Sequence, residues 1–155
     1  MGSAFAMNLD LAAMNAQIDA IGDGAEQHVR PAAQAAIQVL YDEVLLRVPT
    51  SLKGHWFHGS SFKKTGQKYF FDAGSLRAAI YQAFSQDNSG PGRATYHVSW
   101  NAKKAPYGHM VNSGTSRSPA RPFLANAWDA RIADAKKAAE DRYALGLEEV
   151  IGAAT

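Results

Sequence analysis

The stretch APYGHMVNSGTSRSPARPF, residues 105–123, differs from the rest of the chain in its dense succession of structural signals. Tyr107 and Val111 lie in a short alternating run that favours a strand. Glycine and hydroxyl residues at 113–116 favour a turn, and Pro122 suits the first turn of a helix. The segment therefore predicts a strand, a turn and a helix start, which place Arg117, Arg121 and Phe123 where sheet and helix meet.

Helical periodicity flanks this segment on both sides. Apolar residues recur at intervals of three and four over residues 11–21, and the GDG of residues 22–24 predicts a break. A second helix follows over residues 29–48, with a start or a kink between His28 and Pro31 and an end before Pro49. The last helix is expected from about Pro122 to a stop near Gly152.

The middle of the chain predicts a small sheet. The aromatic run of residues 69–71 suits a strand, whereas Leu76, Ile80 and Phe84 have helical spacing. After the loop SQDNSGPGR, residues 96–100 alternate as a strand that is expected to pair with residues 107–112 across a hairpin. These elements predict an α+β domain with N-terminal helices, a small, mostly antiparallel sheet and a long C-terminal helix packed on the sheet.

Length and composition set the broad class of protein. The 155 residues suit a single domain, 1–155, and the absence of cysteine excludes disulfides and cysteine-ligated zinc. The first residues lack a signal-peptide pattern, and no apolar run is long enough to span a membrane. We therefore expect a protein made in the cytoplasm, without a membrane partner.

Charge is distributed unevenly along the chain. Residues 1–49 hold two basic and six acidic side chains, residues 50–125 hold ten and two, and residues 126–155 hold four and six. The net charges are therefore −4, +8 and −2. A basic middle between acidic ends could bind a polyanion or an acidic surface on a neighbouring copy, or could be a solvated face.

Catalytic and metal-binding motifs are absent from the sequence. GHWFHGSS, residues 54–61, has P-loop glycine spacing but lacks the phosphate-binding lysine. His55 and His58 have no third metal ligand nearby, and Ser113, Thr115 and Ser116 beside His109 are better explained as turn formers than as a nucleophile and base. We therefore expect neither an enzyme nor a cofactor.

Nucleic-acid binding is the alternative that the residues leave open. Lysines and arginines share the middle region with aromatic side chains that could stack on bases. No helix-turn-helix, RRM or zinc-finger pattern accompanies them. The alternative function is thus a basic DNA-binding module without sequence specificity.

Two segments carry a resemblance to a known family. The first is APYGHMVNSGTSRSPARPFLANAW, residues 105–128, which has Ala-Pro-Tyr, a short strand, Gly-Thr-Ser and then Ala-x-Pro-Phe at a helix start. The second combines LLRVP, residues 45–49, with AGSLRAAIY, residues 73–81. In these features the chain resembles the gene-product-ten-like tail-component family, the tail-completion or neck proteins of long-tailed double-stranded DNA phages of the lambdoid, HK ninety-seven type.

The chain departs from the family pattern at two places. The strand before Gly-Thr-Ser usually carries a Val-Glu pair, whereas Val111 is followed here by Asn112 and Ser113. The interval from Ser51 to Asp72 is much longer than in shorter family members. We interpret residues 51–72 as an extended loop or arm, of which residues 53–67 order against a partner.

The resemblance implies a structural protein of the virion neck. It implies a homo-oligomeric ring, a hexamer or alternatively a dodecamer, between the portal-side connector and the tail terminator or tail tube, with genomic DNA passing through the lumen without sequence-specific contact. A ring needs a heterologous contact, which the charge asymmetry suits. The predicted interface comprises Lys63, Lys64, Lys103, Lys104, Arg117, Arg121, Pro122 and Phe123, and the predicted turn residues are Gly74, Gly114 and Thr115.

Overall fold

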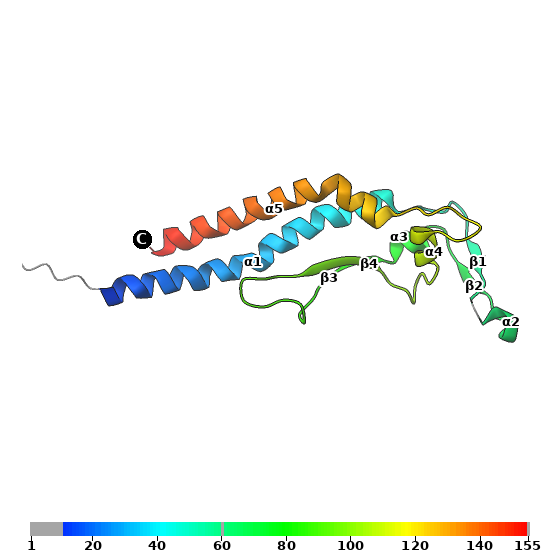
Figure 1. Ribbon diagram of the computed structural model, residues 1–155, viewed down its shortest axis with the longest axis horizontal. Coiled ribbons are helices and arrows are strands. Elements are labelled where there is room, and N and C mark those ends of the chain that lie inside the picture. Colours follow the sequence, from blue (N-terminus) through cyan, green and yellow to red (C-terminus); the bar gives the residue numbers. More distant parts are fainter. Residues whose placement is uncertain (1–10, 60, 155) are drawn as a thin grey trace, which may run out of the picture.

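The computed structural model describes residues 11–59 and 61–154 and has a long pair of antiparallel helices as its frame (Figure 1). Helix α1 spans Leu11–Arg47 and α5 spans Phe123–Ala154. The other elements follow one another between these two helices. They are β1 (His55–Phe57), α2 (Phe62–Thr65), β2 (Tyr69–Phe71), α3 (Ser75–Ala78), β3 (Ile80–Phe84), β4 (Tyr96–Trp100) and α4 (Gly108–Ser113).

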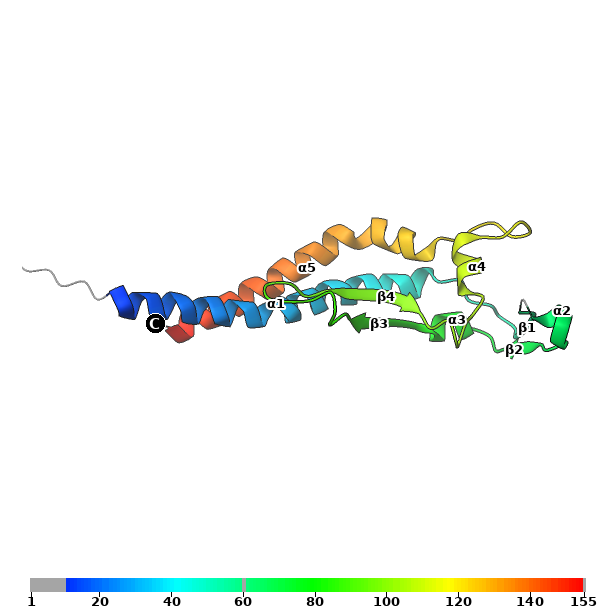
Figure 2. The same ribbon diagram turned by 60° about the horizontal axis from the view of Figure 1, so that its bottom comes forward.

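The strands form two separate antiparallel hairpins. In the larger one, β3 pairs with β4 in a register that joins Ile80 to Trp100 and Phe84 to Tyr96, and both strands lie along α1. In the smaller one, β1 pairs with β2, and α2 lies between them in sequence. Figures 1 and 2 show this second hairpin at the end of the molecule where α1 stops and α5 starts. The expected α+β class is therefore confirmed.

The main core lies where the helix pair meets the short elements. Its buried residues come from the end of α1, from α3 and β3, from the segment before α4 and from the start of α5: Val44, Val48, Leu76, Ala79, Ile80, Ala105, Tyr107, Phe123 and Ala127. Trp100 and Leu124 pack against this cluster. The long C-terminal helix therefore contacts the sheet at its first turns, whereas its main partner along its length is α1.

Two glycines allow α1 and α5 to approach each other closely. A Cβ on Gly24 would lie 2.6 Å from a methyl carbon of Val150, and a Cβ on Gly146 would overlap the imidazole ring of His28. The close packing of α1 against α5 thus depends on the lack of a side chain at Gly24 and Gly146. Helix α1 continues through residues 22–24 and Pro31, so the predicted break and the alternative of a helix start near Pro31 are wrong. The other alternative, a kink between His28 and Pro31, stays a prediction.

Three further predictions from apolar spacing are wrong. Residues 107–112 were expected as a strand, but residues 108–113 form α4, and the partner of β4 is β3. Residues 76–84 were expected to be helical, but only 75–78 are, and 80–84 form β3. Gly152 does not end α5, which continues to Ala154. The strands at 69–71 and 96–100, the end of α1 before Pro49 and the start of α5 after Pro122 are confirmed.

No helix in residues 11–59 and 61–154 combines the length and the apolar character needed to cross a lipid bilayer.

Candidate functional site

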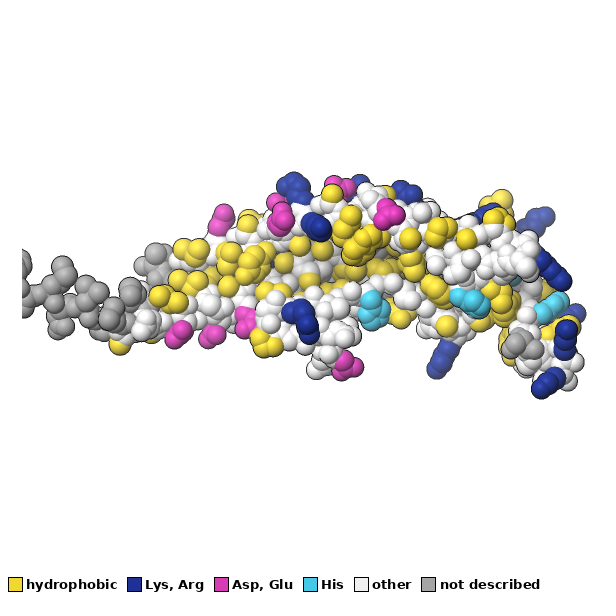
Figure 3. Space-filling view, viewed as in Figure 1, with side chains coloured by type: hydrophobic (Ala, Val, Ile, Leu, Met, Phe, Trp, Pro, Cys, Tyr) yellow, Lys and Arg dark blue, Asp and Glu magenta, His cyan; other side chains and the backbone are white. Residues whose placement is uncertain are grey.

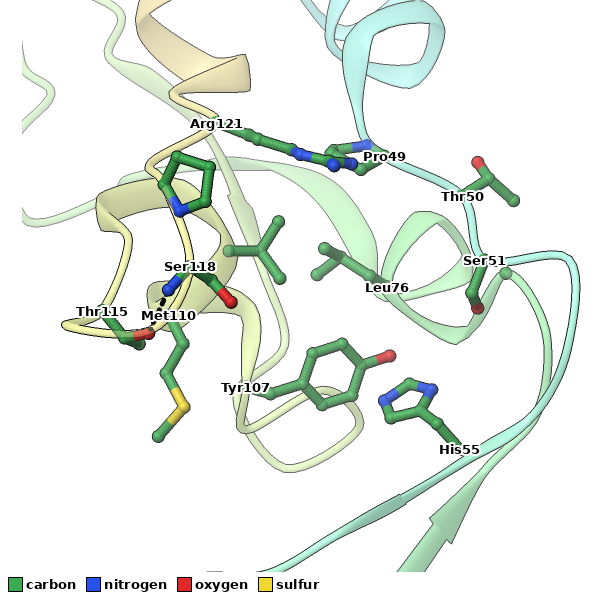
Figure 4. Close-up of a pocket in the computed structure, with 13 residues that line it drawn as sticks. Pro49, Thr50, Ser51, His55, Leu76, Tyr107, Met110, Thr115, Ser118 and Arg121 are labelled. Atoms are coloured by element: carbon green, nitrogen blue, oxygen red, sulfur yellow. Dashed lines mark hydrogen bonds between the residues drawn. The ribbon is translucent and has the colours of Figure 1, made fainter.

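Residues from three segments of the chain, 49–55, 74–76 and 107–121, meet around one cavity of about 470 Å³ (Figure 4). One wall is the chain that leaves α1, a second is the start of α3, and a third is α4 with the loop that follows it. The lining residues are Pro49, Thr50, Ser51, His55, Gly74, Leu76, Tyr107, Met110, Val111, Thr115, Ser118, Pro119 and Arg121. Residues far apart in the sequence thus build a single apolar and hydroxyl-lined hollow with one cationic side chain.

Tyr107 is the central aromatic side chain of this site. Its ring meets that of His55 edge-on with a centroid distance of 4.7 Å, and it meets Phe71 at 5.1 Å. Burial raises the pKa of the Tyr107 hydroxyl, and hydrogen bonds with the Ser75 side chain and the Leu76 backbone act in the opposite direction. Tyr107 therefore connects the body of the protein to the β1–β2 hairpin.

The loop between α4 and α5 is a compact turn. The Thr115 amide donates to the Ser118 carbonyl oxygen at 2.8 Å, and the Thr115 hydroxyl oxygen accepts from the amides of Arg117 and Ser118. Gly114 has φ +76°, and a Cβ there would lie 2.6 Å from the amide nitrogen of Ala120. The structure thus places Gly114 and Thr115 in a turn, as the sequence suggested.

Gly74, the third predicted turn residue, precedes α3 with φ +75° and lines the cavity. A Cβ at this position would lie 3.6 Å from the Thr50 methyl carbon, which is an ordinary contact. The left-handed backbone, rather than a lack of space, therefore favours glycine here.

Arg121 and Arg117 are both exposed, but only Arg121 lines the cavity. The Arg121 amide donates to the Val111 carbonyl oxygen at 2.9 Å, which fixes the backbone, and its side chain extends toward Pro49 (Figure 4). Within the described part of the chain, neither guanidinium has a carboxylate within ion-pair distance. Both remain available to an acidic group of a partner.

The remaining predicted interface residues do not form one surface in the structure. Phe123 is only 2% exposed and packs against Trp100, so it belongs to the core and is not part of a surface. Pro122 is half-buried beside it. Lys63 and Lys64 are exposed on α2, and Lys103 and Lys104 are exposed in the turn between β4 and α4. All four lysines lie near the same end of the molecule as Arg121.

The histidines make local contacts rather than a metal site. His58 stacks on Phe62, and the His109 Nδ1 lies 2.8 Å from the Pro106 carbonyl oxygen. Among the residues that the structure describes, no three His, Asp or Glu side chains are grouped so that they could hold a metal ion. Sequence reasoning missed the aromatic cluster around Tyr107, because its members come from three separate segments.

Comparisons of the chain with protein-family models, with curated proteins and with solved structures found no match.

Proposed function

We propose that this chain is a ring-forming structural subunit of a phage neck, a tail-completion or head–tail joining protein. In this role it links the portal-side connector to the tail terminator or tail tube and lets DNA pass through its lumen. Its location is the virion, after assembly in the host cytoplasm. The resemblance of residues 45–49, 73–81 and 105–128 to that family is the origin of the proposal.

One structural observation supports it above all others. The three segments that carry the resemblance are separated in the sequence, yet each of them contributes residues to the cavity: Pro49 from the first, Gly74 and Leu76 from the second, and Tyr107, Thr115 and Arg121 from the third. A shared motif whose parts meet in space is typical of one structural or interaction unit. We infer that this unit forms part of the contact between ring subunits.

The charge distribution also suits a heterologous contact. Residues 50–78 and 101–121 hold nine basic side chains and only Asp72 as an acid, whereas residues 11–29 and 143–154 hold five acids and no Lys or Arg. Figure 3 shows Lys and Arg side chains concentrated near the β1–β2 hairpin. A subunit with opposite charges at its two ends favours head-to-tail association.

Arg121→Glu tests the proposal. The Arg121 side chain is exposed and its backbone bonds do not depend on the guanidinium, so the variant should retain the wild-type circular dichroism spectrum. We expect it to lose assembly into rings or into complete particles. Lys136→Glu, an equal charge change on the exposed surface of α5, is the control. Normal assembly of Arg121→Glu would contradict a role for this site in the ring.

A basic DNA-binding module is the second candidate function, and the β1–β2 hairpin favours it. Residues 51–71 contain four lysines and no acid, together with exposed aromatic side chains. If these four lysines contacted phosphates, the logarithm of the duplex affinity would fall with the logarithm of salt concentration with a slope of roughly −3.6. A salt titration of duplex binding distinguishes the functions, because the ring subunit predicts little affinity at any salt concentration.

A further inference from the structure

The β1–β2 hairpin presents an aromatic pair to the outside. Trp56 and Phe70 are cross-strand partners, their ring centroids are 5.2 Å apart in an edge-on arrangement, and they are 62% and 52% exposed. Gly54 lies directly under the Phe70 ring, where a Cβ would overlap it. The pair is therefore held in one geometry although the described part of the chain leaves much of it uncovered.

This outward face differs from the other face of the same hairpin. His55, Phe57 and Phe71 point to the opposite side, because side chains alternate along a strand, and all three contact Tyr107. The hairpin thus needs only one of its faces for attachment to the body. Large aromatic side chains on the remaining face are typical of a protein interface.

Four lysines belong to the same segment of the chain as the aromatic pair. Lys53, Lys63, Lys64 and Lys68 lie in residues 51–71, which contain no Asp or Glu. Lys68 lies over the Phe62 ring at 5.8 Å, and none of the four has a carboxylate within ion-pair distance among the described residues. We call Trp56, Phe70 and these four lysines the arm face. Its partner should combine apolar contact area with negative charge.

The opposite end of the same molecule has this chemistry. Helix α1 extends past the β3–β4 hairpin, whose loop reaches it where the Gly92 amide donates to Glu26 at 3.3 Å (Figure 1). The start of α1 also extends beyond the C-terminal end of α5 (Figure 1), and the side chains of residues 15–20 are exposed. Residues 11–29 and 143–154, here called the acidic tip, carry Asp19, Asp23, Glu26, Glu148 and Glu149, with the exposed apolar side chains of Ile18 and Leu145 among them.

The arm face and the acidic tip cannot meet within one molecule. The part of α1 from Glu26 to Arg47 alone separates them by roughly 30 Å, at 1.5 Å per residue. Screening limits charge interactions to about 8 Å at physiological ionic strength, so the two ends do not attract each other within one chain. Any contact between them therefore joins two copies.

We propose that the arm face of one copy docks on the acidic tip of a second copy. This inference rests on the proposed function, because it identifies two further surfaces of the ring contact beside the cavity that Arg121 lines. Trp56 and Phe70 cover the apolar side chains of the tip, and the lysines pair with its carboxylates. The contact is heterologous, so each copy uses both of its ends, and repetition with a fixed rotation closes a ring.

A mixing experiment tests this contact directly. The arm variant is Lys63→Glu/Lys64→Glu, and the tip variant is Asp19→Lys/Asp23→Lys; all four side chains are exposed on helices, and the variants should fold. Lys136→Glu/Lys137→Glu is the matched control, since it makes the same charge change at two exposed lysines of α5 outside both proposed surfaces. Mass photometry measures the particle masses at equal protein concentrations.

We expect the wild type and the control to assemble, and the arm variant and the tip variant each to stay monomeric at tenfold higher concentration. Their equimolar mixture should assemble again into rings that alternate the two variants, because each contact between unlike variants brings opposite charges together. A chain that carries all four reversals should assemble again. Wild-type assembly by the arm variant, or an entirely monomeric mixture, would overturn the inference.

The outcomes also separate this inference from the proposed function. If the wild type forms rings and the arm variant does too, the arm contact is wrong and the ring function stands. If a third variant, Lys103→Glu/Lys104→Glu, alone blocks assembly, the docking surface is the turn between β4 and α4 and the inference is wrong. If the arm variant loses only duplex DNA binding, the arm face is a nucleic-acid surface and the inference is again overturned. A wild type that never assembles would contradict both.

Discussion

His55 and Tyr107 lie side by side in the wall of the cavity and meet edge-on, with ring centroids 4.7 Å apart, and this contact ties the β1–β2 hairpin to the body of the protein. Tyr107→Ala should therefore release the hairpin as well as open a void in the core. A buried aromatic residue replaced by alanine costs about 3 kcal/mol or more of unfolding free energy. Chemical denaturation measures the loss, and hydrogen exchange of residues 55–57 and 69–71 measures the release.

Phe70→Ala is the control for the Tyr107 variant, because Phe70 lies on the outward face of the hairpin. We expect it to change hydrogen exchange of the hairpin far less than Tyr107→Ala. Equal effects of the two substitutions would show that Tyr107 is not the anchor.

Tyr107 should also make stability depend on alkaline pH. Burial raises its pKa in the folded state above the ordinary value of 10.0. The unfolded chain then loses the phenolic proton at a lower pH than the folded chain does, so the contribution to stability is fully present below about pH 10 and is lost as pH rises through the folded pKa. Tyr107→Phe lacks this contribution.

We therefore expect the difference in unfolding free energy between wild type and Tyr107→Phe to be constant below about pH 10 and to change in favour of the variant above it. Urea denaturation at a series of pH values measures this difference. A constant difference up to pH 11 would contradict the burial effect.

Gly146→Ala should destabilise the helix pair although alanine has the higher helix propensity. A methyl group at residue 146 would overlap the His28 ring, so α1 and α5 would have to separate or the imidazole would have to move. Gly22→Ala is the matched control, because a Cβ there has no neighbour within 4 Å. We expect the control to gain up to about 1 kcal/mol and Gly146→Ala to lose more than that. A higher melting temperature for both variants would contradict the close packing of the two helices.

Gly114→Ala should disturb the loop that carries Arg117 and Arg121. The substitution combines a positive φ with a steric overlap against Ala120, whereas Gly66 has φ +68° and open space around it. Gly66→Ala measures the penalty of a left-handed helical backbone alone, about 1 kcal/mol, whereas Gly114 has ψ 175° and lies in a region that is essentially restricted to glycine. We expect Gly114→Ala to cost at least twice as much. Equal losses in the two variants, measured by denaturation, would mean that the loop adjusts without cost.

Apolar spacing predicted an element correctly where its pattern fits either a helix or a strand but not both. Tyr96, Val98 and Trp100 alternate strictly and form β4, and the long series after Pro122 forms α5. Leu76, Ile80 and Phe84 lie four apart, as do Tyr107 and Val111. An interval of four fits a helix and is also an even number, which fits a strand, so these segments were assigned to the wrong class.

Tertiary contacts explain the rest of the difference between the sequence and the structure. Gly22 and Gly24 each cost α1 about 1 kcal/mol, and at Gly24 the close contact with Val150 of α5 offsets this cost. The composition of residues 51–72 indicated an arm, but the cross-strand pairing of Trp56 with Phe70 depends on a register that no local pattern specifies. Likewise, the sequence assigned Phe123 to an interface. Its burial depends on Trp100, which lies in another element, so no local pattern predicts it.

The central claim, that the chain is a ring-forming subunit, is tested most directly by images of the purified wild-type protein. Negative-stain electron microscopy over a range of protein concentrations would show the assembled state without any partner protein. The account predicts closed rings of a single copy number, six or twelve, with an open centre wide enough for duplex DNA. Monomers at every concentration, or open filaments without closed rings, would contradict it.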